Sequence, residues 1–87
     1  MEFVSYTEKE GVSQIAMDDG KANAMGFKMF AELEEAIERA LASSNVIILT
    51  GRPGLLSAGF DLKVIQEGTE QEKSELVSKG ISILMRL

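Results

Sequence analysis

Residues 46–49 read VIIL, an aliphatic run with no polar residue inside it, and the run follows a long stretch of helical periodicity. Because hydrophobicity does not alternate along the run, we expect a strand with both faces buried. Such strands are typical of parallel sheets, and parallel pairing needs a crossover connection, usually a helix. The sequence therefore predicts an α/β fold with a right-handed crossover between an earlier strand and residues 46–49.

The residues before this run supply the partner strand and the helix. Residues 2–7 alternate, and residues 12–17 follow a polar bend, which predicts an antiparallel hairpin with a longer turn. Apolar residues then recur at three- and four-residue steps from residue 27 to about residue 42, which predicts a helix. Its expected buried stripe is Phe30, Leu33, Ala36, Ile37, Ala40 and Leu41. Its expected solvated face carries Glu32, Glu34, Glu35, Glu38 and Arg39.

The residues after the run predict two more helices. A loop over residues 50–57 leads to a short helix over residues 58–66, and Thr69 with Glu72 fits a capping box for a last helix from about residue 70. Its apolar positions are Leu76, Val77, Gly80, Ile81, Leu84 and Leu87. Because no stop signal precedes its apolar end, we expect residues 1–87 to be the N-terminal part of a single, longer domain.

Composition excludes several kinds of chemistry. The chain has no cysteine and no histidine, so disulfides, thiol chemistry and imidazole catalysis are excluded, and we expect no metal site. Its 14 acidic against 9 basic residues give a net charge of −5, which disfavours nucleic acid as a partner. We expect a cytoplasmic protein without a membrane partner, since neither a signal peptide nor a spanning apolar run is visible.

The segment GRPGLLSAGFDLK joins the buried strand to the short helix, where unpaired amides and the helix dipole favour an anion. Ala58 and Gly59 would leave the approach to these amides open. Phe60 would offer its amide and turn its ring into an acyl or core pocket. Asp61 would cap the helix start, and Lys63 suits a phosphate. The same residues also fit a plain loop whose glycine merely permits a turn. The spacings of a Walker A loop and of a dinucleotide-binding fingerprint are both missing.

Four segments, in order, resemble parts of the crotonase (enoyl-CoA hydratase/isomerase) family. GVSQIAMDD is similar to its second strand, KANAM to its Asn-Ala-Leu loop and FKMFAELEEAIERA to its first long helix. NVIILTGRPGLLSAGFDLK resembles its strand and F-S-A-G-x-D-L/I corner. The resemblance implies a crotonase-like α/β start of hairpin, long helix, buried parallel strand, short helix and terminal helix, forming an incomplete domain. Met25 replaces the usual leucine, and Asp19-Gly20-Lys21 replaces a more frequent proline-containing approach to the loop.

The resemblance implies an enzyme of fatty acid metabolism, a lyase or an isomerase, that acts on acyl-CoA thioesters without a further cofactor. The residue between the glycine and the aspartate of the motif, here Phe60, supplies one of two oxyanion-hole amides, which stabilise a thioester enolate. The positions that match CoA-binding positions are Ala22, Ala24, Ala58, Asp61, Leu62 and Lys63, with Lys63 reaching a CoA phosphate. Lys21 and Arg52 could add positive charge, although a solvated surface role fits each equally well.

The resemblance also implies parts that these residues do not contain. The second oxyanion amide and the catalytic glutamates are expected beyond Leu87, so the 87 residues alone should be inactive. The full-length protein is expected to form trimers or hexamers. Two other functions stay open: a non-catalytic acyl-CoA-binding module, and a small acidic interaction module that pairs through its last helix.

Overall fold

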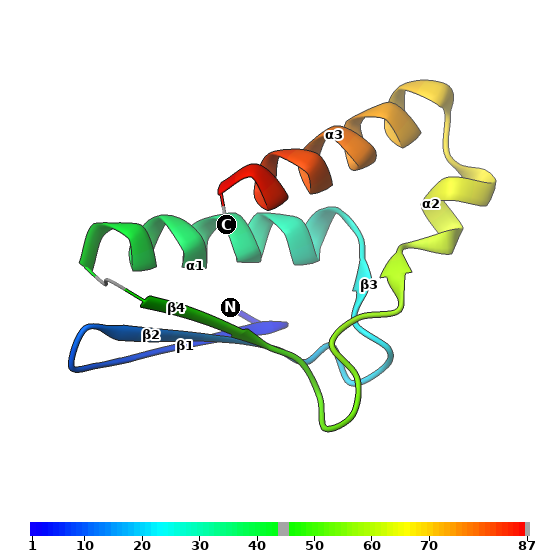
Figure 1. The fold of residues 1–87 in the computed structure, drawn as a ribbon. Coiled ribbons are helices and arrows are strands. Elements are labelled where there is room, and N and C mark those ends of the chain that lie inside the picture. Colours follow the sequence, from blue (N-terminus) through cyan, green and yellow to red (C-terminus); the bar gives the residue numbers. More distant parts are fainter. Residues whose placement is uncertain (44–45, 87) are drawn as a thin grey trace.

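The computed structural model describes residues 1–43 and 46–86. Figure 1 shows three layers: a sheet, helix α1 lying on it, and helix α3 on the other side of α1. The elements in chain order are β1 (Val4–Lys9), β2 (Val12–Met17), β3 (Ala24–Met25), α1 (Phe27–Ser43), β4 (Val46–Thr50), β5 (Gly59–Phe60), α2 (Leu62–Glu67) and α3 (Glu70–Arg86).

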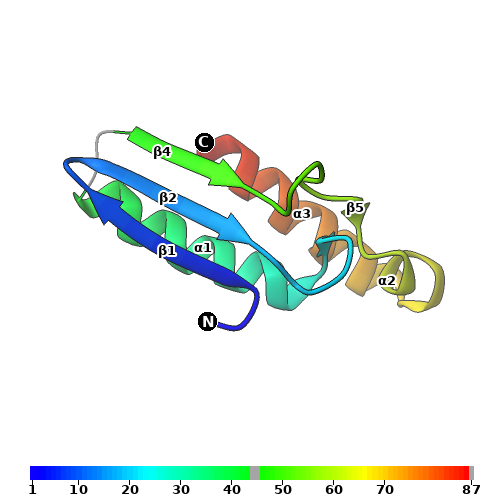
Figure 2. The ribbon, with the colours of Figure 1, turned by 90° about the horizontal axis from the view of Figure 1, so that it is seen from below.

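The main sheet has the strand order β1-β2-β4, with β2 in the middle (Figure 2). β1 is antiparallel to β2, and β2 is parallel to β4, so that Ile15 lies opposite both Tyr6 and Leu49. Helix α1 forms the crossover from β2 to β4, and its side chains Leu33 and Ile37 are buried with Ile15. The predicted hairpin, long helix and parallel pairing are confirmed.

The expected longer hairpin turn is wrong. β1 continues to Lys9, which pairs with Val12, so only Glu10 and Gly11 form the turn. Both have positive φ, 54° and 79°, the backbone of the two-residue type I′ turn that matches the twist of paired strands. The polar residues at the end of β1 stay in the strand because this part of it is exposed to solvent.

The expected burial of β4 on both faces is also wrong for the described residues. Ile47 and Leu49 are half-buried and pack against the core, whereas Val46 is 50% exposed and Ile48 is 45% exposed. Helix α1 covers one face of the sheet, as both ribbon views show. In residues 1–43 and 46–86 the opposite face stays open, so alternation in burial appears where the sequence has none.

Two predictions about α1 fail in a related way. Leu41, expected in the buried stripe, is 52% exposed, while Glu32, expected in solvent, is only 8% exposed. The Glu32 carboxylate accepts hydrogen bonds from the N–H groups of Phe3 at 2.8 Å and Val4 at 3.1 Å. A buried carboxylate that binds two backbone donors at the start of a strand satisfies all three groups. Glu32 is therefore structural.

Helix α3 begins as predicted. The Thr69 N–H donates to Glu72 Oε1 at 2.9 Å, and the Glu72 N–H donates to Thr69 Oγ1 at 3.1 Å, which completes the capping box. The hydrogen bonds that the Glu72 carboxylate accepts from Thr69, first from its backbone N–H and then from its side chain, lower the pKa of Glu72. Of the predicted apolar positions, Leu76 and Gly80 are buried, together with Ile83. Three are exposed, Val77, Ile81 and Leu84, and Leu87 lies outside the described residues.

Candidate active site at the β3–β5 corner

The two segments singled out in the sequence meet in a second, two-stranded sheet. β3 and β5 pair in parallel, with Ala24 opposite Gly59 and Met25 opposite Phe60. Residues 59–60 are therefore in a strand, and the prediction that a helix begins at residues 58–61 is wrong, because α2 starts only at Leu62. Pairing with β3, a contact between distant loops, overrides the local preference of this segment.

The hydrogen bonds of this small sheet fix the direction of one amide. The Asp61 N–H donates to the Met25 carbonyl at 3.0 Å. Successive N–H groups of a strand point to opposite sides, so a residue whose neighbour bonds the partner strand directs its own N–H away from it. The Phe60 N–H, one residue before Asp61, therefore points away from β3. It is a backbone donor in a strand, not at the mouth of a helix.

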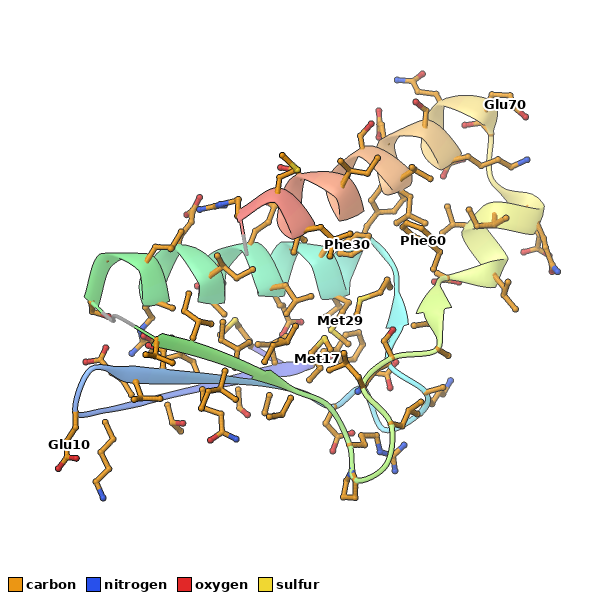
Figure 3. All side chains as sticks on the ribbon, in the orientation of Figure 1. Glu10, Met17, Met29, Phe30, Phe60 and Glu70 are labelled. Carbon is orange, nitrogen blue, oxygen red and sulfur yellow. The ribbon has the colours of Figure 1, made fainter. Side chains whose placement is uncertain are left out.

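The Phe60 ring packs between α1 and α3 (Figure 3). It meets the Phe30 ring edge-on, with centroids 6.2 Å apart and planes at 74°. A Cβ on Gly80 would lie 3.0 Å from the Phe60 ring and 3.2 Å from the Phe30 ring, so α3 approaches this closely only because residue 80 is glycine. The ring thus faces apolar residues, as expected, although Phe60 stays 42% exposed.

An apolar hollow of about 390 Å³ adjoins Phe60. Side chains from the sheet, α1 and α3 line it, including Met17, Leu33, Leu49, Val77 and Leu84, together with Gly59. Within the described part of the chain, its lining contains no acid and no base. The hollow can therefore hold an apolar group but supplies no residue for proton transfer.

The predicted CoA-binding residues divide between two hollows. Lys21, Ala24 and Asp61 line one of about 370 Å³. Lys63 lines another of about 220 Å³, next to Glu67 and Glu72. The first three residues thus line one hollow and Lys63 lines another, although the Lys63 backbone is hydrogen-bonded to Asp61.

The other predicted residues lie around the corner itself. Ala22 and Ala58 are exposed, and their backbones join where the Ala58 N–H donates to the Ala22 carbonyl at 2.9 Å. Leu62 is exposed at the start of α2. Asp61 caps that helix, as predicted, by accepting a hydrogen bond from the Lys63 N–H at 2.9 Å.

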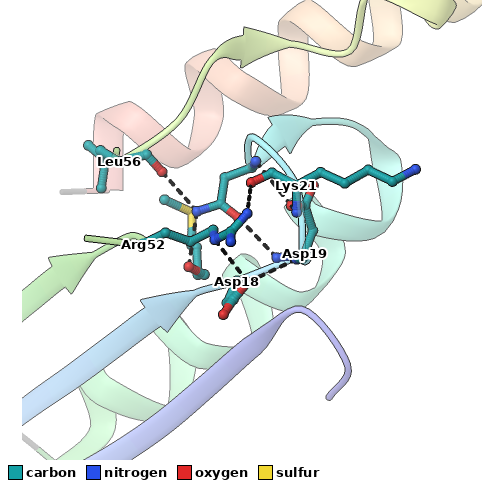
Figure 4. A network of polar contacts seen from close by, with 8 residues as sticks. Asp18, Asp19, Lys21, Arg52 and Leu56 are labelled. Carbon is teal, nitrogen blue, oxygen red and sulfur yellow. Dashed lines mark hydrogen bonds and ion pairs between the residues drawn. The ribbon is translucent and has the colours of Figure 1, made fainter. Parts of the chain in front are cut away.

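Asn23, to which the sequence assigned no role of its own, holds the two loops together. It is fully buried, with φ 53°. Its Nδ2 donates to the carbonyls of Met17 at 3.0 Å and Leu56 at 3.1 Å, and its Oδ1 accepts from the Asp19 N–H at 3.0 Å (Figure 4). Asparagine tolerates this left-handed backbone better than most residues, and its amide can donate and accept at once. The residue type itself, an asparagine between two small residues of the loop, was therefore the feature of the sequence that could have identified this role.

Charged side chains complete the same network. Asp19 Oδ1 accepts from the N–H groups of Lys21 at 2.7 Å and Asn23 at 3.1 Å. Desolvation raises the pKa of Asp19, but these and further backbone hydrogen bonds together outweigh it and hold the pKa below its usual value. Arg52 donates to the Lys21 carbonyl and lies 3.6 Å from the Asp18 carboxylate (Figure 4). Arg52 thus has structural partners here.

The turn that precedes the corner follows its sequence closely. The Leu55 N–H donates to the Arg52 carbonyl at 2.8 Å across Pro53 and Gly54, and Gly54 has φ 76°. Proline followed by a glycine with positive φ is the pattern of a type II turn.

Within residues 1–43 and 46–86, no group of three or more acidic residues is placed to hold a metal ion. None of the helices in this part of the chain has the length and hydropathy of a membrane span.

A β-strand, crossover helix and parallel strand that lead into this corner define a chain of the crotonase type, and comparison with known families agrees. The model of the enoyl-CoA hydratase/isomerase family matches residues 7–87, and the chain belongs to this family. Among named relatives, it is 37% identical over 67 residues to a Bacillus subtilis protein, YhaR, that is named as an enoyl-CoA hydratase/isomerase. That match covers 75% of this chain and 26% of YhaR.

Solved structures give the same fold. The chain is 37% identical to EchA3 of Mycobacterium tuberculosis, with a TM-score of 0.86, and the match covers 92% of this chain and 34% of that one. An enoyl-CoA hydratase from Thermoplasma volcanium is 25% identical with a TM-score of 0.88, and the match covers 99% of this chain and 36% of that one. The crotonase-like α/β fold is confirmed, and the chain spans about a third of these structures. The M. tuberculosis protein is named a hydratase in one structure and an isomerase in another.

Proposed function

We propose that residues 1–87 form the N-terminal, acyl-CoA-binding part of a single-domain enzyme of the enoyl-CoA hydratase/isomerase type. In this proposal the Phe60 N–H donates to the carbonyl oxygen of a bound thioester. The observation that carries it is the hydrogen bond from the Asp61 N–H to the Met25 carbonyl, because it commits the neighbouring amide to β3 and leaves the Phe60 N–H directed away from that strand.

The surroundings of the amide support this role. A Cβ placed on Gly59 would meet no atom within 4 Å, so the backbone here is open to approach. The apolar hollow begins at the same two residues, Gly59 and Phe60, and suits an acyl group. When water adds to the β carbon of an enoyl thioester, or when a base removes a proton from its α carbon, negative charge moves to the carbonyl oxygen. A fixed N–H donor there typically lowers the barrier by about 3 kcal/mol.

Coenzyme A would bind along the outer side of the corner, as substrate and not as a separate cofactor. We assign to it the residues matched in the sequence, namely Lys21, Ala22, Ala24, Ala58, Asp61, Leu62 and Lys63. The shared hollow of Lys21, Ala24 and Asp61 supports this assignment. Lys63 would reach a phosphate through its flexible stem.

The proton-transfer groups would come from outside these residues. The apolar hollow has no acid among its described lining residues, and Glu32 already accepts two backbone hydrogen bonds. The corner would therefore polarise the thioester in either reaction, and other residues would select hydration or isomerisation. The two reaction names given to the M. tuberculosis relative fit this division of roles.

The test compares two glycines in the full-length protein. Gly59 and Gly54 have φ values of 97° and 76°, and a Cβ on either meets no atom within 4 Å, so alanine strains both backbones similarly. Only Gly59 adjoins the proposed donor. Gly59→Ala should lower turnover of crotonyl-CoA about 100-fold, because it redirects the Phe60 N–H. It should also reduce the infrared shift of the bound thioester carbonyl. Gly54→Ala should change neither.

Two results would contradict these expectations. Equal effects of Gly59→Ala and Gly54→Ala would contradict the assignment of the Phe60 N–H. A full-length protein that binds no acyl-CoA would contradict the proposed function and favour an interaction module.

The role of Lys63 has its own test. Lys63→Glu should weaken binding of CoA thioesters about tenfold or more through repulsion of phosphate, but leave pantetheine thioesters nearly unaffected. Lys79→Glu makes the same charge change at an exposed position of α3 and serves as the control. Calorimetric titration of both ligands measures the difference. Equal losses for the two ligands would exclude a phosphate contact.

A further inference from the structure

The β3–β5 sheet is too short to hold the Phe60 amide by itself. It contains two residue pairs, and short ladders specify register weakly. The peptide group that carries the Phe60 N–H follows Gly59, the residue type with the greatest backbone freedom, which here has φ 97°. Some other contact must therefore restrain this peptide if its N–H is to keep one direction.

Ser57 supplies such a contact. Its hydroxyl accepts a hydrogen bond from the Gly59 N–H at 3.0 Å and donates one to the Asn23 carbonyl at 2.7 Å. One side chain thus joins the residue before the donor to the opposite loop. Because the hydroxyl bonds in both directions, removing it releases Gly59 and the loop contact together.

Asn23 gives this link a fixed base. It is fully buried, and its side chain bonds the end of β2 through Met17, the turn through Asp19 and the other loop through Leu56. A buried amide with three satisfied hydrogen bonds has little freedom to move. Two successive hydrogen bonds therefore run from this anchored residue to Gly59, next to the proposed donor.

We propose that Ser57 and Asn23 are positioning residues that fix the direction of the Phe60 N–H group. This inference rests on the proposed function and goes beyond it, because it assigns the precision of the oxyanion donor to two side chains that need not touch the substrate. Ser57 acts through Gly59, and Asn23 acts through Ser57. The Phe60 ring, seated between Phe30 and Gly80, restrains the side chain, so loss of Ser57 should loosen the amide without displacing the residue.

The experiment uses Ser57→Ala in the full-length protein, with crotonyl-CoA labelled with ¹³C at its carbonyl. The shift of the bound carbonyl band, measured from its position in free crotonyl-CoA, should be clearly smaller than in the wild type, because only the second oxyanion donor would remain fixed. The kcat should drop about tenfold or more, while KM changes by no more than about twofold. The reason is that the Phe60 N–H would no longer be held in the direction that bonds the oxygen in the transition state. Ser57→Thr keeps the hydroxyl and should restore both quantities. Ser74→Ala, at an exposed position of α3, is the control and should change neither.

If Ser57→Ala does not fold, a second variant tests the same role. Ser57→Cys keeps the size of the side chain but bonds weakly, so it should give a carbonyl shift between those of the wild type and the unbound ligand. Thermal unfolding of each variant separates stability from positioning. A purely structural role would lower the melting temperature, but it would not lower kcat while leaving KM unchanged.

The outcomes separate this inference from the function on which it rests. A wild-type carbonyl shift in both Ser57→Ala and Ser57→Cys would overturn the positioning role, while the Gly59→Ala result would still support the oxyanion donor. Failure of Ser57→Thr to restore kcat would also overturn it. A wild-type protein that binds crotonyl-CoA with no carbonyl shift would remove the proposed donor and the positioning role together.

Discussion

The main sheet with α1 and the β3–β5 corner are held in place by different forces. In the first, apolar burial dominates: Ile15, Leu33 and Ile37 are almost inaccessible to solvent. In the second, Phe60 is 42% exposed, and the loops are joined mainly by hydrogen bonds of Asn23 and its neighbours. Burial depends little on direction, whereas hydrogen bonds fix it. Apolar burial therefore holds the scaffold together, whereas directional hydrogen bonds hold the candidate site together.

The largest expected effect is in the scaffold. Leu33→Ala removes a side chain from the centre of the core and should lower the free energy of unfolding by about 3 kcal/mol. Leu41→Ala changes the same residue type on the same helix at an exposed position and should cost less than about 0.5 kcal/mol. Chemical denaturation of both variants measures the contrast. Similar costs at the two positions would mean that burial on α1 does not decide the stability of this half.

The next effect is in the corner. Asn23→Ala removes the side-chain donor to the Met17 and Leu56 carbonyls and places alanine in a left-handed backbone, so it should cost about 2 kcal/mol. The damage should be local: hydrogen exchange of the Asp61 N–H, bonded to Met25, should speed up far more than exchange of the amides of the β1–β2 ladder. Gln14→Ala, an exposed amide on β2, is the control. A uniform loss of protection throughout the chain would mean that the two regions open together, as one cooperative unit.

The smallest effect concerns pH. The pKa of Asp19 is lowered in the folded chain, so its carboxylate stabilises the fold above the unfolded pKa near about 4, and this contribution is lost as pH falls through the folded pKa. Asp19→Asn cannot ionise and should show a flatter fall of stability below about pH 4. Urea unfolding at a series of pH values measures the slopes. A steeper slope in Asp19→Asn would contradict the sign.

Most of the scaffold was predictable from the sequence because it follows periodicity. The three-residue and four-residue spacing gave α1, the aliphatic run gave the parallel strand, and Thr69 with Glu72 gave the start of α3. The errors lie where a distant partner decides. Glu32 is buried because two amides 28 and 29 residues away need an acceptor, which no local pattern records.

The sequence singled out both segments that meet in the candidate site, but not the way in which they are joined. The sequence placed Phe60 at a helix start, whereas the structure places it in a strand paired with residue 25. The hydrogen bond from Asn23 to Leu56 spans 33 residues, and that from Ser57 spans 34. Such bonds exist only once the crossover has brought the loops together, so spacing along the chain could not reveal them.

Gly80 on α3 determines how closely this helix can approach the Phe60 ring. Since a methyl group at residue 80 would lie 3.0 Å from the Phe60 ring, any larger residue there must push the ring and, through it, the backbone of Phe60. If the Phe60 N–H acts as proposed, a change at residue 80 would alter both the direction of this N–H and the apolar hollow that Gly80 lines. Position 80 is where we would begin to diversify a library of variants with altered rate.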